Sequence, residues 1–282
     1  NPKKEYEESL KLVIAQDENF KKRFPLRYKI LAQKNALSYE PIVNIKSDLN
    51  SAFLVFPNRY MGNPASMFGH LFITLKSDEG LYQSDIIHFI ADASSATMFN
   101  YVTSGLSGGF KGSFVTDIYY KKLKEYTYSD DRDVYFYDLN LSKEVVYDMQ
   151  LHAIELKKTT FDYYFLEKNC AYFIARFLNN VTHAQIRMNN FTVLPSDIIN
   201  SLIKNKVIQS SYFRPSSTSV FSNSYQLLSF KEKKHVKHLM FNKQSSNNYS
   251  DNVYKSFLDI SYYGINNFTN YAEAIRYNRI LA

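Results

Sequence analysis

The sequence has one cysteine, no tryptophan, and only eight glycines and seven prolines in 282 residues. A single cysteine excludes an internal disulfide, and with six scattered histidines it lacks the ligand spacing of a zinc site. No apolar run approaches about 18 residues, so the sequence predicts no membrane-spanning helix. The start Asn1–Lys4 is not a signal peptide, although an exported protein would look the same after its signal or anchor was removed. We expect no metal and no cofactor.

What is present indicates a folded, aromatic-rich and basic protein. Hydrophobic residues make up 45% and charged residues 22%, which is typical of a globular chain with one large or two moderate cores. The net charge of +7 lies in the last third, because residues 201–282 hold eleven Lys and Arg against four Asp and Glu. Such a surface suits anionic lipid headgroups or nucleic acid. Nucleic acid is the poorer partner, since no zinc pattern, RNP-like strand or helix-turn-helix signal accompanies the charge.

Hydrophobic periodicity predicts an α+β protein, with a small antiparallel sheet packed against helices and flanking helical segments. Strands are expected at 52–56, 69–76, 86–92 and 133–139. Helices are expected in two segments of 5–35 around Phe24-Pro25, and at 142–158, 170–179, 198–208, 251–262 and 268–281. The glycine-rich stretch 104–114 is expected to be a loop. The chain then divides into a helical region at 1–48, a core at 49–210, and a basic, largely helical region at 211–282.

Cys170 is the residue best placed to carry chemistry. It precedes an apolar segment, Ala171–Leu178, whose pattern predicts the first turns of a helix. A thiol at a helix N-terminus meets free backbone N–H groups and the positive end of the helix dipole, which favour the reactive thiolate. The alternative is that Cys170 is buried and inert, because free cysteine is among the residue types most often found in a core.

A thiol nucleophile needs a base within hydrogen-bond reach and a third group that orients the base. His70 opens a predicted strand and is the best candidate for the base. His88 and Asp92 share one face of the next strand, so either could be the third group if the two strands pair. A serine hydrolase is not indicated, because no Gly-x-Ser-x-Gly sequence is present. The remaining histidines fit less well: His152, His183, His235 and His238.

Several spaced segments stand out as motifs: 23–28 (RFPLRY), 56–70 (FPNRYMGNPASMFGH), 105–112 (GLSGGFKG), 125–126 with 132–133, and 162–172. In this order they resemble the Lnb-type family of bacterial lipoprotein N-acyltransferases. The resemblance runs over about residues 20 to 200. The chain beyond residue 200 carries no motif that we can place.

The order of His70 before Asn169-Cys170 also resembles circularly permuted papain-like (NlpC-type) folds. Lecithin:retinol acyltransferase and its phospholipid-using relatives have such a fold. The segment Ile86–Phe89 resembles the strand that carries the second histidine of those enzymes. Lnb-like relatives often lack that histidine and have Asn at the position of Asp92. The third member of the triad is therefore open between His88 and Asp92.

The resemblance implies transfer of an acyl chain from a membrane phospholipid, through a thioester on Cys170, to the amine of a diacylglyceryl-cysteine lipoprotein. His70 would act as base and then as acid, and the Cys170 N–H would hold the oxyanion with Tyr60 or Ser66. It also implies a membrane-associated protein on the periplasmic side of the bacterial envelope, without a nucleic-acid partner. Further oxyanion or substrate candidates in the motifs are Asn169, Tyr164 and Lys111.

Two other classes of function stay open. A cysteine peptidase or amidase of cell-wall peptides would use the same fold and triad but would need a polar cleft instead of an apolar groove. A non-catalytic envelope binding module would keep Cys170 as a core residue. For the acyltransferase, basic residues of the last third beside exposed Phe or Tyr are expected to meet an anionic membrane surface, unless they form only a solvated helix face. The densest candidates are Lys231, Lys233, Lys234 and Lys237.

Overall fold

The computed structural model describes residues 1–59, 69–78, 80–92, 103–105, 107–126, 130–182, 184–189 and 191–242, with the side chains of 237–242 excepted. The chain forms two compact units, of which the first comprises residues 1–121 and 136–212. The second comprises residues 122–135 and 213–282. Tyr60, Ser66 and the helices expected at 251–262 and 268–281 lie outside the described residues.

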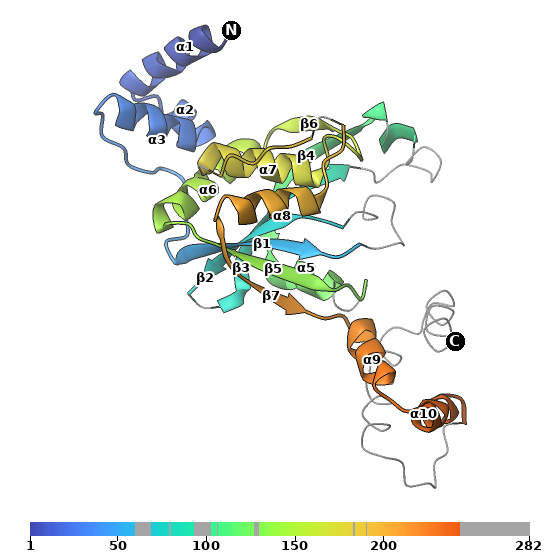
Figure 1. Ribbon diagram of the computed structural model, residues 1–282. Coiled ribbons are helices and arrows are strands. Elements are labelled where there is room, and N and C mark those ends of the chain that lie inside the picture. Colours follow the sequence, from blue (N-terminus) through green and yellow to red (C-terminus); the bar gives the residue numbers. More distant parts are fainter. Residues whose placement is uncertain are drawn as a thin grey trace. The chain divides into compact units, whose positions relative to one another are not determined.

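A seven-stranded sheet is the centre of the first unit, and only the end residues of β5 and β7 belong to the second (Figure 1). Its order is β6-β4-β3-β2-β1-β5-β7. The pairings β1–β2, β2–β3, β3–β4 and β4–β6 are antiparallel, so the expected α+β architecture is confirmed. The strands are β1 Leu49–Pro57, β2 Phe72–Ser77, β3 Gly80–Asp92, β4 Phe110–Ile118, β5 Val134–Leu139, β6 Thr160–Tyr163 and β7 Ile208–Arg214.

The hairpin of β2 and β3 confirms that the His70 strand pairs beside the next strand. Ile73 lies opposite Ile87, and Phe72 lies opposite His88. Side chains alternate along a strand, so every second residue faces the same side of the sheet. Leu71, Ile73, Ile87 and Phe89 accordingly belong to one apolar core.

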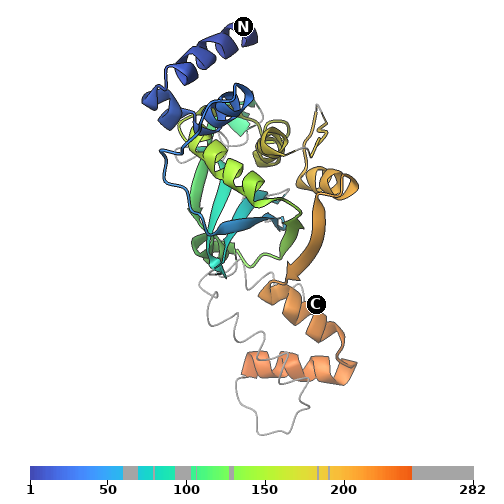
Figure 2. The same ribbon diagram turned by 90° about the vertical axis from the view of Figure 1, so that its left-hand side faces the viewer.

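Two helices pack on that face of the sheet, α6 Lys143–Leu156 and α7 Cys170–Val181 (Figures 1 and 2). Ser142 caps α6 as predicted, because its hydroxyl accepts a hydrogen bond from the Val145 N–H at 3.4 Å. A third helix, α8 Pro195–Lys204, packs on α7 and buries Ile198 and Leu202 in the same core. The burial of this shared apolar face holds the helices on the sheet.

Three helices precede the sheet, α1 Pro2–Ile14, α2 Glu18–Arg23 and α3 Pro25–Lys34. The sequence predicted two helical segments here. The extra break arises at Asp17, whose carboxylate caps α2 by accepting from the Phe20 N–H at 2.6 Å. Lys29 joins α3 to α6, because its side chain is 7% exposed and lies 2.7 Å from an Asp148 carboxylate oxygen. The N-terminal helices are therefore attached to the sheet unit by a largely buried ion pair.

Two expectations about the chain beyond β3 were wrong. The stretch 104–114 is not all loop, because β4 begins at Phe110 and contains Gly112. The space above Gly112 is filled by the Phe89 ring, which an added Cβ would meet at 2.4 Å, so the glycine serves strand packing. Ile208 starts strand β7, whereas the helix expected to reach it ends at Lys204. Strand β6 was not predicted at all.

The second unit contains α9 Ser217–Gln226 and α10 Phe230–Asn242. The Asp131 carboxylate accepts from the Ser217 N–H at 2.8 Å and from the Thr218 N–H at 3.1 Å, which satisfies the first turn of α9. Phe221 and Val236 are fully buried here. The basic run of the sequence thus lies on a helix.

Candidate functional site

One end of the sheet brings together the predicted site residues that the structure describes. At this end β1, β3 and β6 finish while β2 and β4 begin, because neighbouring strands run antiparallel. His70 comes just before β2, Asp92 ends β3, and Lys111 is the second residue of β4. The chain leaves β6 here and reaches Cys170 at the start of α7. Five strands and the start of α7 thus contribute to this sheet end.

Asn169 fixes the turn that presents Cys170. Its side-chain oxygen accepts from the Tyr172 N–H at 3.1 Å, which caps α7; this role of Asn169 was not predicted from the sequence. Its amide nitrogen donates to the carbonyl oxygens of Phe165 at 3.0 Å and Val193 at 2.8 Å. All three hydrogen bonds of the Asn169 side chain therefore stay within the fold, and Cys170 itself is 5% exposed. The thiol lies at a helix N-terminus, as predicted, and it is buried in the core, as the alternative of an inert cysteine also predicted.

His70 and His88 lie beside each other at the sheet end. Their ring centroids are 6.4 Å apart in an edge-to-face arrangement, and the His70 ring is 6.0 Å from the Phe72 ring. The backbone N–H of His70 donates to the Pro57 carbonyl at 3.2 Å, which connects the segment before β2 to the end of β1. The pairing of the two strands therefore places a second imidazole next to the proposed base.

The two faces of the sheet separate His88 from Cys170. Phe89 faces α7, since its ring stacks on Phe173 with centroids 3.9 Å apart. Alternation then turns His88 and Asp92 to the opposite face, and the regular β3–β4 register confirms that these two share a face. Cys170 packs in the same core as Phe89. The Cys170–His70 dyad stays a prediction. His70 lies just before β2, at the end of the sheet, so the alternation that separates His88 from Cys170 does not decide which way the His70 side chain faces.

Asp117 is an acidic neighbour of His88 that was not predicted from the sequence. It lies on β4 opposite Ile86, on the same face as His88. A hydrogen bond from the Ile118 N–H and an ion pair with Lys121 hold the pKa of Asp117 below its usual range, with a smaller contribution from His88. Two-residue alternation would have pointed to Asp117 if β4 had been recognised as a strand.

The glycine motif of 105–112 packs tightly on the turn before Cys170. A Cβ at Gly105 would meet the Phe165 ring at 2.2 Å, and a Cβ at Gly108 would meet the Tyr164 ring at 2.2 Å. Gly108 also has φ +79°, which favours glycine. The Phe165 N–H donates to the Gly105 carbonyl at 2.8 Å. The glycines thus allow close approach of the segment that leads into α7.

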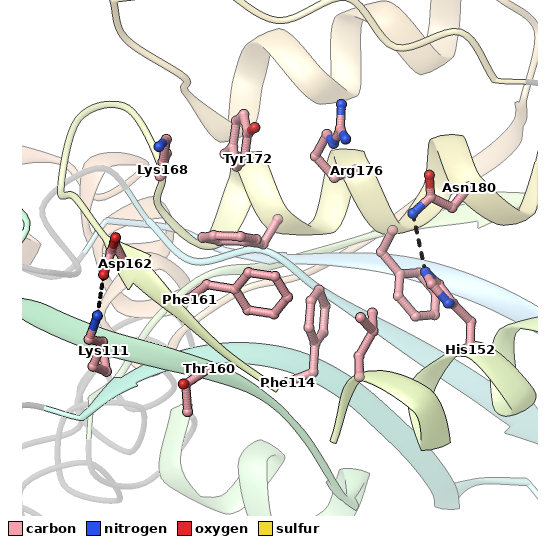
Figure 3. A pocket seen from close by; sticks show the side chains of 13 residues that line it. Lys111, Phe114, His152, Thr160, Phe161, Asp162, Lys168, Tyr172, Arg176 and Asn180 are labelled. Carbon is pink, nitrogen blue, oxygen red and sulfur yellow. Dashed lines mark hydrogen bonds and ion pairs between the residues drawn. The ribbon is translucent and has the colours of Figure 1, made fainter. Parts of the chain in front are cut away.

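A cavity of about 490 Å³ runs along α7 on the face that carries Phe173 (Figure 3). Its apolar lining contains the buried rings of Phe114, Phe173 and Phe177 and the half-buried ring of Phe161. The lining on α7 follows one helical stripe, which the sequence alone could have suggested. That stripe consists of Tyr172, Phe173, Arg176, Phe177 and Asn180.

Charged residues surround the apolar part of the cavity. Figure 3 shows Lys168, Asp162 and Lys111 near one end and Asn180 with His152 near the other. The ion pair with Lys111 holds the pKa of Asp162 below its usual range. Lys168 and Arg176 are exposed, and neither makes an ion pair within the described ranges. The rim therefore offers two exposed cations, of which Lys168 lies 5.5 Å from the centre of the Tyr164 ring.

His152 is held in one tautomer at the far end of the cavity. Asn180 Nδ2 donates to His152 Nε2 at 3.3 Å, so His152 Nδ1 carries the proton and donates to a Glu155 carboxylate oxygen at 3.3 Å. The His152 ring lies 5.0 Å from the Phe177 ring. This arrangement gives the cavity a polar end wall.

The family model of the Lnb N-terminal periplasmic domain matches residues 39–205, more than half of the chain. The chain belongs to the Lnb family. The matched range of the Lnb domain includes the sheet end, Cys170 and every residue that lines the cavity. The domain's description places it in the periplasm, and thus in the bacterial cell envelope. No curated protein and no solved structure matches the chain.

Two absences concern the described residues only. None of their helices is long and apolar enough to cross a membrane. Among the same residues, no group of three or more His, Cys, Asp or Glu is arranged to hold a metal ion.

Proposed function

We propose that this Lnb-family protein is a thiol-dependent acyltransferase that N-acylates bacterial lipoproteins. The donor is a membrane phospholipid, and the acceptor is the amine of an N-terminal diacylglyceryl-cysteine. The observation that carries the proposal is the aromatic cavity along α7, the helix that begins with Cys170. The family membership supports the same function.

The proposed reaction has two steps on Cys170. The thiolate attacks the ester carbonyl of the donor, and the lysophospholipid leaves as an alcohol after taking a proton from His70. The acceptor amine then attacks the thioester, His70 removes a proton from the nitrogen, and the thiolate is released. An ester bond is thereby exchanged for an amide bond, with no cofactor and no net redox change. The Cys170 N–H at the start of α7 would stabilise the oxyanions, with Tyr60 or Ser66 as predicted partners.

The aromatic wall of the cavity supports an acyl chain as the occupant, while the rest of the lining is polar. An acyl chain gains about 0.8 kcal/mol for each CH₂ that leaves water, and the rings of Phe114, Phe161 and Phe173 offer it an apolar wall. The exposed cations Lys168 and Arg176 suit the phosphate of a donor headgroup.

Mass spectrometry tests the reaction directly. The protein is incubated with phosphatidylglycerol and a synthetic diacylglyceryl-cysteine lipopeptide, and the lipopeptide should gain the mass of one acyl chain. Without acceptor, the protein itself should carry the acyl group until hydroxylamine removes it. Cys170→Ser and His70→Ala should abolish both signals while the circular dichroism spectrum stays unchanged. Acylation of the lipopeptide by Cys170→Ser would refute the mechanism.

The same samples separate the alternative functions. Cleavage of cell-wall peptides, without acyl transfer, would indicate the peptidase or amidase. A Cys170 thiol that iodoacetamide does not modify at neutral pH would indicate the non-catalytic binding module. Arg176→Glu should raise the KM for the anionic donor and leave kcat unchanged, whereas Lys157→Glu, an exposed control at the end of α6, should change neither.

A further inference from the structure

The second unit exposes two large apolar side chains three residues apart. Leu227 is 88% exposed and Phe230 is 87% exposed, the highest values among the large hydrophobic side chains that the structure describes. They occupy the junction between α9 and α10. Leu228 between them is 5% exposed, so the junction separates one inward apolar residue from two outward ones. Their exposure leaves apolar surface in water, which is unfavourable unless a partner covers it.

The junction is built as a rigid turn. Ser229 and Glu232 form a capping box at the start of α10: the Glu232 carboxylate accepts from the Ser229 N–H at 2.9 Å, and the Ser229 hydroxyl accepts from the Glu232 N–H at 3.3 Å. Lys233 Nζ donates to the Gln226 carbonyl at 3.4 Å at the end of α9. The turn is therefore fixed from both helices, and it holds Leu227 and Phe230 outward.

Positive charge accompanies the two apolar side chains. Lys231 and Lys234 are exposed, and within the described side chains neither makes an ion pair. Lys234 lies four residues after Phe230, so both occupy one face of α10. Glu232, the acidic residue of this segment, is engaged in the capping box. The surface thus combines an apolar tip with cations and no available carboxylate nearby in the sequence.

We propose that this tip, Leu227 and Phe230 with Lys231 and Lys234, docks the second unit on an anionic membrane surface. Large apolar side chains beside lysines are the pattern of proteins that lie in a bilayer interface, where the rings enter the headgroup region and the cations meet anionic lipids. A soluble protein partner would need a complementary acidic groove. The charge complementarity and the small, convex set of two apolar residues favour the lipid surface. The proposal stands apart from acyl transfer and is tested by binding alone.

The absence of tryptophan from the sequence allows a direct measurement. Phe230→Trp introduces the chain's one indole at the tip, and Phe191→Trp places it at a site in the first unit that is 80% exposed. With vesicles of phosphatidylcholine and phosphatidylglycerol at low salt, the Phe230→Trp emission should shift to the blue and that of Phe191→Trp should stay unchanged. Vesicles of phosphatidylcholine alone should give no shift in either variant.

Co-sedimentation of the full chain with the same vesicles measures how much the lysines and the apolar side chains each contribute to membrane binding. The variant Lys231→Gln with Lys234→Gln should weaken binding about 25-fold, at about a factor of five for each lysine. The charge-matched control, Lys157→Gln with Lys158→Gln, should bind like the unaltered protein. The variant Leu227→Ser with Phe230→Ser should lose binding, and added salt should weaken that of the unaltered protein.

Three results would overturn the proposal. The first is that neither the unaltered protein nor Phe230→Trp responds to anionic vesicles. The second is that the tip variants bind these vesicles as tightly as the control variant does. In the third, sedimentation velocity without lipid shows self-association that Leu227→Ser with Phe230→Ser abolishes, which would make the tip a contact between copies of the chain. None of these measurements uses an assay of acyl transfer, so failure of the proposed enzymatic function would leave the docking proposal unaffected.

Discussion

Substitution of Asn169 offers the sharpest test of how the turn before Cys170 is built. The side chain caps α7 through its oxygen and donates from its nitrogen to two carbonyl groups, and the residue is buried. Asn169→Ala removes the cap, which costs about 1 kcal/mol, and leaves the carbonyls of Phe165 and Val193 without this donor, which costs about 1–3 kcal/mol more. The expected loss is about 3 kcal/mol, or roughly 6–12 °C in Tm for a unit of this size.

Asn169→Asp separates capping from the two donated hydrogen bonds. Aspartate caps helices about as well as asparagine, so a residue that only capped α7 would tolerate this change. Here a carboxylate oxygen would face two carbonyl oxygens in place of the amide nitrogen, so the variant should be at least as unstable as Asn169→Ala. Urea unfolding with hydrogen exchange at the α7 amides measures both variants. Stability of Asn169→Asp within about 0.5 kcal/mol of the unaltered protein would refute this account of the turn.

Three further predictions follow from the same unit. Gly108→Ala should lower stability by about 1–2 kcal/mol or more in urea unfolding, because alanine is strained at φ +79° and its Cβ would meet the Tyr164 ring. Gly80→Ala is the steric control, because a Cβ at Gly80 would have no atom within 4 Å. Burial lowers the pKa of Lys29, but Asp148 and Glu144 outweigh it and hold the pKa above its ordinary 10.5. Its contribution to stability should therefore be complete below pH 10.5 and be lost as the pH rises through the folded-state value, and Lys29→Met should remove that alkaline dependence. Asn180→Trp should fill the far end of the cavity and shift transfer toward shorter acyl chains, as mass spectrometry of competing donors would show; an unchanged chain-length profile would contradict this use of the cavity.

Local signals in the sequence predicted the elements that depend on local chemistry. Ser142 was predicted to begin α6, and it does so because its side chain accepts a backbone N–H of the first turn. Asn169 caps α7 in the same way, and although this cap was not predicted, it could have been read from residue type and position. The hairpin of β2 and β3 was predictable because both strands are apolar and joined by a short turn. Alternation then correctly placed His88 and Asp92 on one face of β3.

The parts that failed depend on contacts between distant segments. Gly112 indicated a loop, but it lies in β4 because the Phe89 ring of the neighbouring strand takes the place of a side chain there. Strand β6 has four residues, and it exists because it pairs with β4 along one edge of the sheet. The cavity combines β4, β6, α6 and α7, so no local pattern could outline it. The missed Asp117 follows from the same failure to recognise β4.

The direction of α7 relates the proposed nucleophile to the cavity. The lining residues of α7 run from Tyr172 to Asn180, which spans about 12 Å along the helix axis at 1.5 Å per residue. Cys170 precedes Tyr172, so it lies at the Lys168 end of this path and His152 marks the other end. An acyl chain whose carbonyl reached the thiol would therefore extend its tail along the phenylalanine rings toward His152. Lys168 lies at the thiol end, where a donor headgroup would remain in water, whereas Arg176 lies midway along the path.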